Sequence, residues 1–483
     1  MDNQTLVILF LVIYLLFLAG IGIYTARRPV SNNEYLFGNG FGFLFSMFGI
    51  AASLFSSFTL QGMPDFFKNH GIGSWVFLGI TDVCLAGLLL YFGLKMRGFA
   101  RHLAAKNNGY APKNLTEWLK QSKMPRWSII FFIIATTIFM VPYVTIGIKG
   151  PAILLQSVIP LGDTHLMWSC AIVLLMLAYS WFGGIRAIFV TDMIQGMLLL
   201  MIVWAIAFFA IKGAGGVAEL FEQAKDINPQ LMSAPGPAGL FNWQFLLISF
   251  ISIITIPYVQ PQMATRMLVA KTDKVFARSS AGLAFFAFIV ILPTLFIGLR
   301  AVGLSVDEGA VSTGNFLLDL INHDATPFLF GMFIVGALAA DMSTVDSQLL
   351  SIGTEWRSAF LKEDIQSHPN AKNGVKIVGL IVALLSLVLA QSNFESLILF
   401  AINSFVGTSL LLPLIVAAVL NSSVKRQLLS IASMVSVTLF LLSLFNIIPN
   451  MLAGYRIELY MYAVLGAMLL LSLLTEKRQY RVS

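Results

Sequence analysis

Charge is what this 483-residue sequence lacks most. Only 11% of its residues are Asp, Glu, Lys or Arg and 58% are hydrophobic, whereas about 25% of a typical soluble domain is charged. Apolar runs of about 20 residues, the length that crosses a bilayer, recur from one end of the chain to the other. Short segments of alternating hydrophobicity, which would indicate a β-barrel, do not occur. The composition predicts an all-α polytopic membrane protein.

Residues typical of catalysis and of transition-metal sites are also scarce. The chain has two cysteines and five histidines. Cys84 and Cys170 fall within expected spans, so we predict small core residues and no disulfide framework. There is no Cys/His metal-site spacing, no phosphate-binding Walker loop and no Gly-x-Ser-x-Gly motif. We therefore expect neither an enzyme nor a cofactor.

Hydropathy divides the whole chain, 1–483, into about thirteen expected spans of one transmembrane domain. The first is not expected to be a cleavable signal, because "MDNQT" carries no basic residue and Arg27 and Arg28 follow the apolar run. The spans cover roughly 4–25, 41–63, 73–95, 127–157, 164–181, 187–211, 241–263, 280–303, 326–354, 375–392, 395–420, 427–448 and 457–475.

The basic residues set the expected orientation, because Lys and Arg gather on the cytoplasmic side of membrane proteins. With an outer N-terminus, all 30 Lys and Arg fall on the inner side except Lys68, Lys149, Lys212, Lys225, Arg300 and Arg456. One missed or added span would spread these basic residues over both sides of the membrane. We expect a multi-pass protein of the plasma (inner) membrane with a cytoplasmic C-terminus. The net charge of +7 comes from the inner loops and needs no nucleic-acid partner.

Two expected spans carry residues that interrupt a helix. The second reads "GIAASLFSSFTLQGMP", and the seventh, "ISIITIPYVQPQMATR", contains Pro257 and Pro261. Each proline removes a backbone donor and frees a carbonyl one turn earlier. One such helix could be a simple kink, but these two each begin a group of five spans, about 41–211 and 241–420, and cross in opposite directions. Matching interruptions in two halves predict an inverted-repeat transporter.

The ninth span contains "AADMSTVDSQLL" at 339–350. At about 100° per residue, its small and hydroxylated residues form one stripe: Gly336, Ala340, Ser343, Thr344, Ser347 and Ser351. Close helix packing could explain the small residues. It does not explain Asp341 and Asp346, because an acid inside the bilayer needs a cation, a proton or a partner.

Asp192 in the sixth span and Asp82 in the third are further acids at membrane depth. We expect no Lys, Arg or His at mid-membrane as a partner for any of them. An alkali cation would explain the imbalance, since hard cations take carboxylate, hydroxyl and carbonyl oxygens. The membrane potential would favour its inward movement by about 2.3 kcal/mol per charge per 100 mV.

The segment "ALAADMSTVDSQLL" resembles the ninth-span motif of the sodium/solute symporter family, in its proline/pantothenate-like branch. "NNEYLFGNG", "NLTEWL", "WFGGIRAIFVTDMIQ" and "QPQMATRMLVAK" are similar to further family segments, in the family's order. The resemblance implies a leucine-transporter-like five-helix inverted repeat. Leu54 stands where the proline carriers have an acid, and Ile253 and Pro257 stand where they have aromatic contacts, which argues against proline itself as substrate.

The resemblance also implies ion sites. Relatives bind their principal sodium ion with oxygens that correspond here to the carbonyls of Ala52, Phe55 and Ala340 and the hydroxyls of Ser343 and Thr344. Some relatives hold a second sodium ion, at positions that correspond to Asp192, Ser343, Asp346 and Ser347. The alternatives to a second sodium ion are a proton at this site and a packing role for Asp346.

Substrate contacts are expected beyond the break in the second span. Ser56 and Thr59 stand where relatives contact substrate, and amide donors at a break suit a carboxylate. Asp82 could face a substrate ammonium group, and Tyr258 and Asn403 could complete the pocket. An amino acid would satisfy both ends. A plain carboxylate, with Asp82 bonded to a neighbouring helix, is the alternative.

The sequence thus favours a sodium-coupled symporter that imports a small organic solute, an amino acid or a small carboxylate. A membrane sensor that acts with a separate signalling partner and a proton-coupled carrier are the alternatives. A channel fits less well, because inverted repeats around a central hydroxyl site suit occlusion better than a continuous pore. Apart from the lipid bilayer, the expected partners are sodium and the solute.

The expected orientation can be tested by labelling single cysteines in intact cells. Replacements of Lys120 and Lys425 should react only after the membrane is permeabilised, whereas a replacement of Lys225 should react from outside. If Lys120 and Lys425 replacements reacted only from outside, the topology would be inverted.

Overall fold

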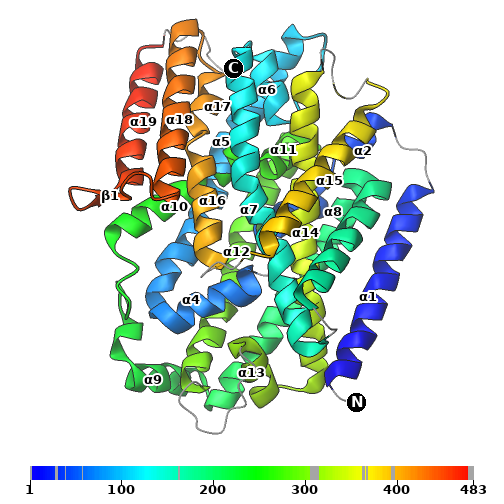
Figure 1. Ribbon diagram of the computed structural model, residues 1–483, viewed down its shortest axis with the longest axis vertical. Helices are drawn as coiled ribbons and strands as arrows, with labels where there is room; N and C mark the ends of the chain where they lie inside the picture. Colours follow the sequence, from blue (N-terminus) through cyan, green and yellow to red (C-terminus); the bar gives the residue numbers. More distant parts are fainter. Residues whose placement is uncertain are drawn as a thin grey trace.

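The computed structural model describes residues 3–27, 31–38, 40–56, 58–160, 164–304, 315–361, 365, 368–392 and 397–476. These residues form a bundle of helices that run mostly from one end of the molecule to the other (Figure 1). Within them, ten helices are long and apolar enough to cross a membrane, or eleven if one bent pair forms a single span. Two shorter apolar helices, Phe43–Ala52 and His165–Ala178, lie in the second and fifth expected spans. The prediction of an all-helical polytopic protein is confirmed.

The long helices follow the expected spans closely. They are α1 (Asn3–Ala26), α5 (Thr81–Lys106), α7 (Arg126–Val158), α8 (Thr164–Ala214), α12 (Asp273–Leu304), α14 (Pro327–Phe360), α15 (Ala371–Ala390), α18 (Ser423–Leu444) and α19 (Ile457–Leu474). The eleventh expected span is divided into α16 (Leu397–Ser409) and α17 (Leu412–Ala417). Pro413 lies in the first turn of α17, where the missing N–H of a proline costs no helical hydrogen bond.

Short elements connect these helices. They are α2 (Asn32–Phe37), α4 (Met63–His70), α6 (Leu115–Gln121), α9 (Val217–Ile227), α13 (Phe316–Asp324), the single turns η2 (Gly71–Gly73), η3 (Val76–Ile80) and η4 (Pro229–Met232), and a two-stranded hairpin, β1 (Met451–Leu452) and β2 (Tyr455–Arg456). The strands are antiparallel, with Met451 opposite Arg456.

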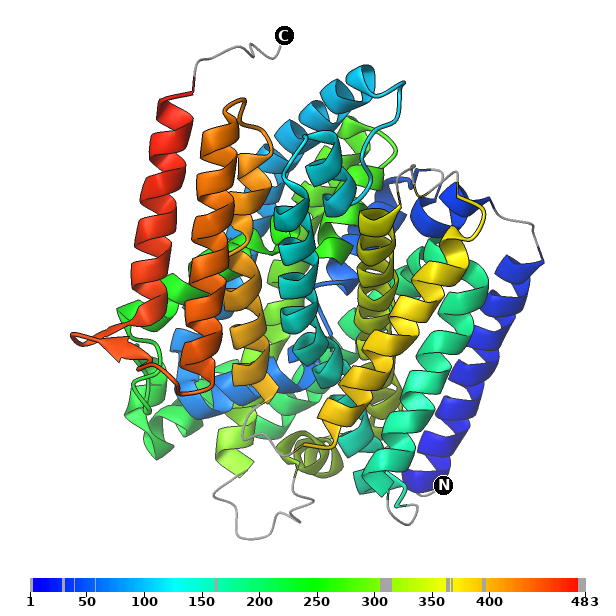
Figure 2. The same ribbon diagram turned by 45° about the horizontal axis from the view of Figure 1, so that its top comes forward.

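Helix α14 is the centre of the bundle. It packs against α8, α15, α7 and α1, and 89% of its apolar window is buried, compared with 22% for α1 and 17% for α19. Figures 1 and 2 show α1 and α19 at opposite edges of the bundle. The polar stripe of the ninth span therefore lies in the interior, whereas the outer helices present apolar side chains where lipid would lie.

Both predicted interruptions are present. Helix α3 (Phe43–Ala52) ends at Ala52, and the chain resumes as a π-helical turn, η1 (Phe58–Gly62). Helices α10 (Trp243–Val259) and α11 (Pro261–Val269) meet at Gln260 with a bend of 53°. Only Pro261 marks this break, because the residue before a proline is pushed into extended conformation. Pro257 lies inside α10.

The fifth and sixth expected spans follow one another within α8 and are separated by a break at Gly184, which lies between the predicted spans 164–181 and 187–211. Gly184 has a φ of 57° and a ψ of −155°, the one non-helical residue within α8. A Cβ atom there would lie 2.4 Å from the Tyr35 carbonyl oxygen. Gly184 is thus required both for its backbone conformation and for the close approach of α2.

The short helix α6 is attached to the end of α14. The Glu355 carboxylate accepts hydrogen bonds from the N–H groups of Leu115 (2.9 Å) and Thr116 (2.6 Å). Lys120 donates to the carbonyls of Ser358 and Leu361 at 2.9 and 2.7 Å. A carboxylate at a helix N-terminus satisfies donors that have no partner within the helix, so this contact holds α6 and α14 together.

We expect Gly184→Ala to destabilise the protein by roughly 1–3 kcal/mol from backbone strain alone, with a further cost from the contact with Tyr35. The measurement is the thermal unfolding midpoint in detergent. Gly87→Ala is the matched control, because a Cβ at Gly87 meets nothing within 4 Å. Equal midpoints for the two variants would contradict the role of Gly184.

Candidate functional site

The break in the second span leaves a backbone carbonyl at the centre of the protein. After α3 ends, the N–H groups of Leu54 and Phe55 both bond the Ala51 carbonyl, at 2.9 Å. The Ala52 carbonyl instead accepts a hydrogen bond from the Thr344 hydroxyl on α14, at 2.8 Å. Ala52 is 2% exposed, so this contact replaces the lost helical bond in a place that water does not reach.

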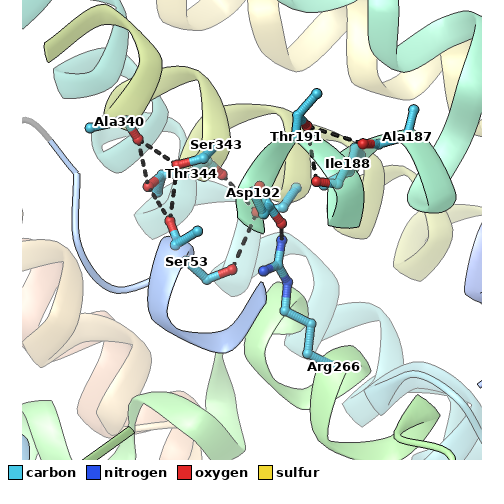
Figure 3. Close-up of polar contacts among 11 residues, drawn as sticks. Ser53, Ala187, Ile188, Thr191, Asp192, Arg266, Ala340, Ser343 and Thr344 are labelled. Atoms are coloured by element: carbon cyan, nitrogen blue, oxygen red, sulfur yellow. Dashed lines mark hydrogen bonds and ion pairs between the residues drawn. The ribbon is translucent and has the colours of Figure 1, made fainter. Parts of the chain in front are cut away.

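Two hydroxyls and two carbonyls of α3 and α14 converge at this point. The Ser343 hydroxyl lies 2.7 Å from the Ala340 carbonyl and 3.3 Å from that of Ala52. The Thr344 hydroxyl lies 3.4 Å from the Ala340 carbonyl. Ser343 and Thr344 are 1% and 2% exposed. Figure 3 shows this group where the blue helix end meets α14. Four buried neutral oxygens at one point form a set that suits a monovalent cation, which would replace the hydrogen bonds among them.

Phe55, the fifth residue expected at this site, lies three residues beyond Ala52. Its side chain is buried against Phe286, with ring centroids 5.6 Å apart. Among the described residues, no hydrogen bond joins the Phe55 carbonyl to the other four. Its place in the site stays a prediction.

Asp192 has a basic partner, contrary to expectation. Its Oδ2 atom lies 2.7 Å from Nη2 of Arg266, and the two side chains are 0% and 2% exposed. Figure 3 shows the Arg266 side chain extending from α11 towards Asp192 on α8. The expectation that no base accompanies the membrane acids is therefore wrong for Asp192.

Arg266 was expected in an inner loop because a charged residue normally marks the end of an apolar run. Helix α11 in fact continues through it to Val269. The sequence does carry a signal, since Met267, Leu268 and Val269 resume the apolar run directly after Arg266.

Ser347 and Asp346 lie in the same region. The Ser347 hydroxyl donates to the Thr344 carbonyl at 2.8 Å and lies 3.5 Å from the Ser53 hydroxyl. Asp346 is 1% exposed. Asp192 is fully buried on α8, the helix that packs against α14. The structure thus brings the second group of expected ion ligands to the neighbourhood of the first.

The candidate substrate residues near the break are buried. Ser56 accepts a hydrogen bond from the Phe58 N–H at 3.2 Å, and its carbonyl accepts one from the Thr59 N–H at 2.9 Å. Thr59 is fully buried, and its hydroxyl has no hydrogen-bond partner among the described residues. A buried hydroxyl in this state is a group that a ligand could satisfy.

The other candidates lie on neighbouring helices. Tyr258 on α10 donates to the Leu88 carbonyl of α5 at 2.6 Å, so its hydroxyl is engaged. Asp82 lies in the first turn of α5, and Asp341, which is 1% exposed, lies on α14. Asn403 is partly buried on α16. These helices form a chain of contacts, in which η1 packs against α16, α16 against α10, and α10 against α5. No hydrogen bond among the described residues joins the candidates to one another across it.

A family model matches most of the chain. The model described as "Sodium:solute symporter family" covers residues 35–435. The chain belongs to the sodium:solute symporter family. It is therefore a membrane transporter, and its function is the sodium-coupled symport of a small solute.

Characterised members of the family share about a quarter of the sequence. A sodium/pantothenate symporter of Haemophilus influenzae is 26% identical over 393 residues, which cover 79% of this chain and 77% of that protein. An osmoregulated proline transporter of Bacillus subtilis is 25% identical, with the same coverage.

Solved structures show that the fold extends over the whole chain. A Na⁺-coupled sialic acid symporter in its substrate-bound, outward-open state superimposes with a TM-score of 0.75 at 18% identity and covers 98% of this chain and 97% of its own. The transporter MhsT, solved with L-phenylalanine, gives a TM-score of 0.55 at 13% identity, with 90% and 99% covered. These neighbours have the leucine-transporter fold, so this symporter has an architecture of that kind.

Proposed function

We propose that this symporter imports an amino acid or a small carboxylate and that its coupling sodium ion binds at the break between α3 and η1. The observation that carries the ion site is the convergence of the Ala52 and Ala340 carbonyls with the Ser343 and Thr344 hydroxyls. The relatives named above transport pantothenate and proline, which both carry a carboxylate. These names support the class of solute for this chain.

We further propose thirteen spans in which 41–211 and 241–420 are inverted repeats, with an outer N-terminus and a cytoplasmic C-terminus. Two interrupted elements support this arrangement: α3 with η1 near the start of the first group, and α10 with α11 near the start of the second. The start of α1 and the end of α19 lie at opposite ends of the bundle (Figure 2), which is consistent with an odd number of crossings.

The geometry indicates how sodium would act. In this structure, the hydroxyls of Ser343 and Thr344 donate to carbonyls. With the ion, the same hydroxyls and carbonyls would all present lone pairs to it, because a hydroxyl proton can rotate away. Sodium would then bind the end of α3 to α14 and stabilise the adjoining turn, Ser56 to Thr59, in one conformation. Substrate affinity would depend on sodium through that turn.

We expect Thr344→Ala and Ser343→Ala to lose sodium-stimulated uptake, because each removes an oxygen ligand from a buried site. Uptake of radiolabelled pantothenate and a panel of amino acids into proteoliposomes, with and without a sodium gradient, measures the effect. Ser351→Ala, about two turns further along the same stripe of α14, is the matched control and should retain stimulation. Undiminished sodium dependence in both ligand variants would refute the site.

The substrate pocket is proposed on the other side of the break. Ser56 and Thr59 would receive the carboxylate, and Asp82 would receive the ammonium group of an amino acid, with Tyr258 and Asn403 at the edges. The Thr59 hydroxyl, for which the described residues offer no hydrogen-bond partner, supports the first contact. The successive contacts of η1 with α16, α16 with α10 and α10 with α5 support the second.

Asp82→Asn should weaken the apparent affinity for an amino acid by at least tenfold, since a charged hydrogen bond contributes about 1.5–3 kcal/mol, while a plain carboxylate should be hardly affected. Apparent affinities from uptake competition test this. Asp226→Asn, on the exposed surface of α9, is the control. An identified amino acid transported by Asp82→Asn with unchanged affinity would rule out the zwitterion.

A further inference from the structure

A groove lies between α1 and α8 on the surface of the bundle that faces lipid. Its walls include Phe17, Gly20, Ile21 and Tyr24 of α1 and Arg186 and Val190 of α8. Its volume is about 360 Å³, within the range of ligand pockets, roughly 300–1,000 Å³. Helix α1 lies at the edge of the bundle (Figures 1 and 2), and Phe17, Gly20 and Tyr24 are exposed. The groove is therefore open to molecules in the bilayer.

The groove extends to about the depth of one membrane leaflet. Phe17 lies about 13.5 Å along the helix axis from Ala26, the last residue of α1, at 1.5 Å per residue. The hydrocarbon core of one leaflet is about 15 Å thick, half that of the bilayer. On α8, Val190 follows Arg186 by about one turn. The groove thus runs from a charged end at the membrane surface to an apolar end near the middle of the bilayer.

Gly20 leaves a space in the wall of the groove. A Cβ atom there would meet nothing within 4 Å, so no close helix contact requires a glycine. Glycine is also unfavourable inside a helix because it loses more conformational freedom than other residues. The missing side chain leaves room for an apolar ligand between Phe17 and Tyr24.

The charged end of the groove has an excess of positive charge. Arg27 directly follows α1 and is exposed. The Arg186 side chain is 35% exposed, and its Nη1 atom lies 3.3 Å from Oε1 of Glu34 on α2. A guanidinium has five N–H donors, and this is the one ionic contact of Arg186 within the described part of the chain. Two arginines and one glutamate leave a single positive charge, which matches the single negative charge of a phosphodiester.

We propose that this groove binds one anionic phospholipid. An acyl chain lies along Phe17, Gly20 and Val190. The phosphodiester lies between Arg186 and Arg27. Basic pockets between transmembrane helices on the cytoplasmic side suit anionic head groups, and the orientation proposed above places this end of α1 in the cytoplasmic leaflet. The bound lipid joins α1 to α8, and its site is separate from the proposed sodium and solute sites.

Native mass spectrometry of the delipidated, detergent-solubilised protein tests this. The probes are dioleoyl phosphatidylglycerol and dioleoyl phosphatidylcholine, which have the same acyl chains and differ in head-group charge. The wild type should bind one phosphatidylglycerol at least tenfold more tightly than phosphatidylcholine. Arg186→Gln should weaken phosphatidylglycerol binding at least tenfold, because it removes hydrogen bonds to a charged group, and should leave phosphatidylcholine binding unchanged.

Glu34→Gln separates lipid binding from a purely structural ion pair. If Arg186 served only to hold α2 through Glu34, the two variants Arg186→Gln and Glu34→Gln would have the same effect. In the proposed site their effects are opposite. Glu34→Gln removes the carboxylate that competes with the phosphodiester for Arg186, so phosphatidylglycerol should bind at least twofold more tightly.

Gly20→Leu tests the apolar part of the groove. The added side chain has room on α1 and would occupy the space of the acyl chain, so binding of both lipids should weaken at least tenfold. Gly466→Leu on α19 is the matched control, because a Cβ atom there also meets nothing within 4 Å. It should bind phosphatidylglycerol as the wild type does.

Three results would overturn the proposal. The first is equal wild-type affinity for the two lipids, which would show an unselective boundary lipid only. The second is parallel losses in Arg186→Gln and Glu34→Gln, which would show a structural ion pair. The third is displacement of phosphatidylglycerol by equimolar sn-glycerol 3-phosphate, which would show a site for free phosphates, because the acyl chain supplies most of a lipid's affinity.

The proposal stays testable if Arg186→Gln does not yield folded protein. Weaker phosphatidylglycerol binding by Gly20→Leu together with tighter binding by Glu34→Gln then supports it. Unchanged affinity in either variant contradicts it.

Discussion

The constraint on which this structure depends is that a helix broken inside a bilayer must have its released backbone groups satisfied by other parts of the protein. Ala52 is the point where this applies. Its carbonyl has lost its helical donor and is met by the hydroxyls of Thr344 and Ser343 on α14. α14 must therefore lie against the break, and the helices α1, α7, α8 and α15 enclose it. The same contact that makes the break tolerable gathers the oxygens that suit an ion.

A second constraint acts through charge. Taking a carboxylate and a guanidinium out of water costs several kcal/mol for each ion, and only a close pair offsets this. Asp192 and Arg266 therefore hold α8 and α11 at a fixed separation. α11 is also the segment that bends away from α10 at Gln260. If α11 moved so that the pair separated, water or another cation would have to replace the Arg266 charge beside Asp192. The pair therefore links movement of the broken seventh span to the ion-binding region.

In the proposed mechanism, the two sides of the break in the second span bind different ligands, the ion on one side and the solute on the other. On the α3 side of the second span, buried oxygens are already bonded to one another, which suits a small ion that can replace those bonds. On the η1 side, the Thr59 hydroxyl lacks a partner within the described part of the chain, and the surrounding helices come from both halves of the chain. Binding at either side acts on the short stretch between Ala52 and Thr59. The proposed coupling of ion to solute thus depends on the continuity of the backbone through the break.

The sequence by itself determined the helical membrane architecture, the positions of both interruptions and the hydroxyl cluster of α14. These follow from local properties: apolar run length, proline and glycine chemistry, and helical periodicity. Only the tertiary structure decided that α8 passes through Gly184 as a kink, that Tyr258 turns its hydroxyl to Leu88, and that Arg266 is buried. Asp192 and Arg266 are 74 residues apart in the chain. A charged residue at the end of an apolar run normally lies at the membrane surface. Arg266 lies in the interior because α11 packs against α3 and α14. There the Asp192 carboxylate compensates its charge.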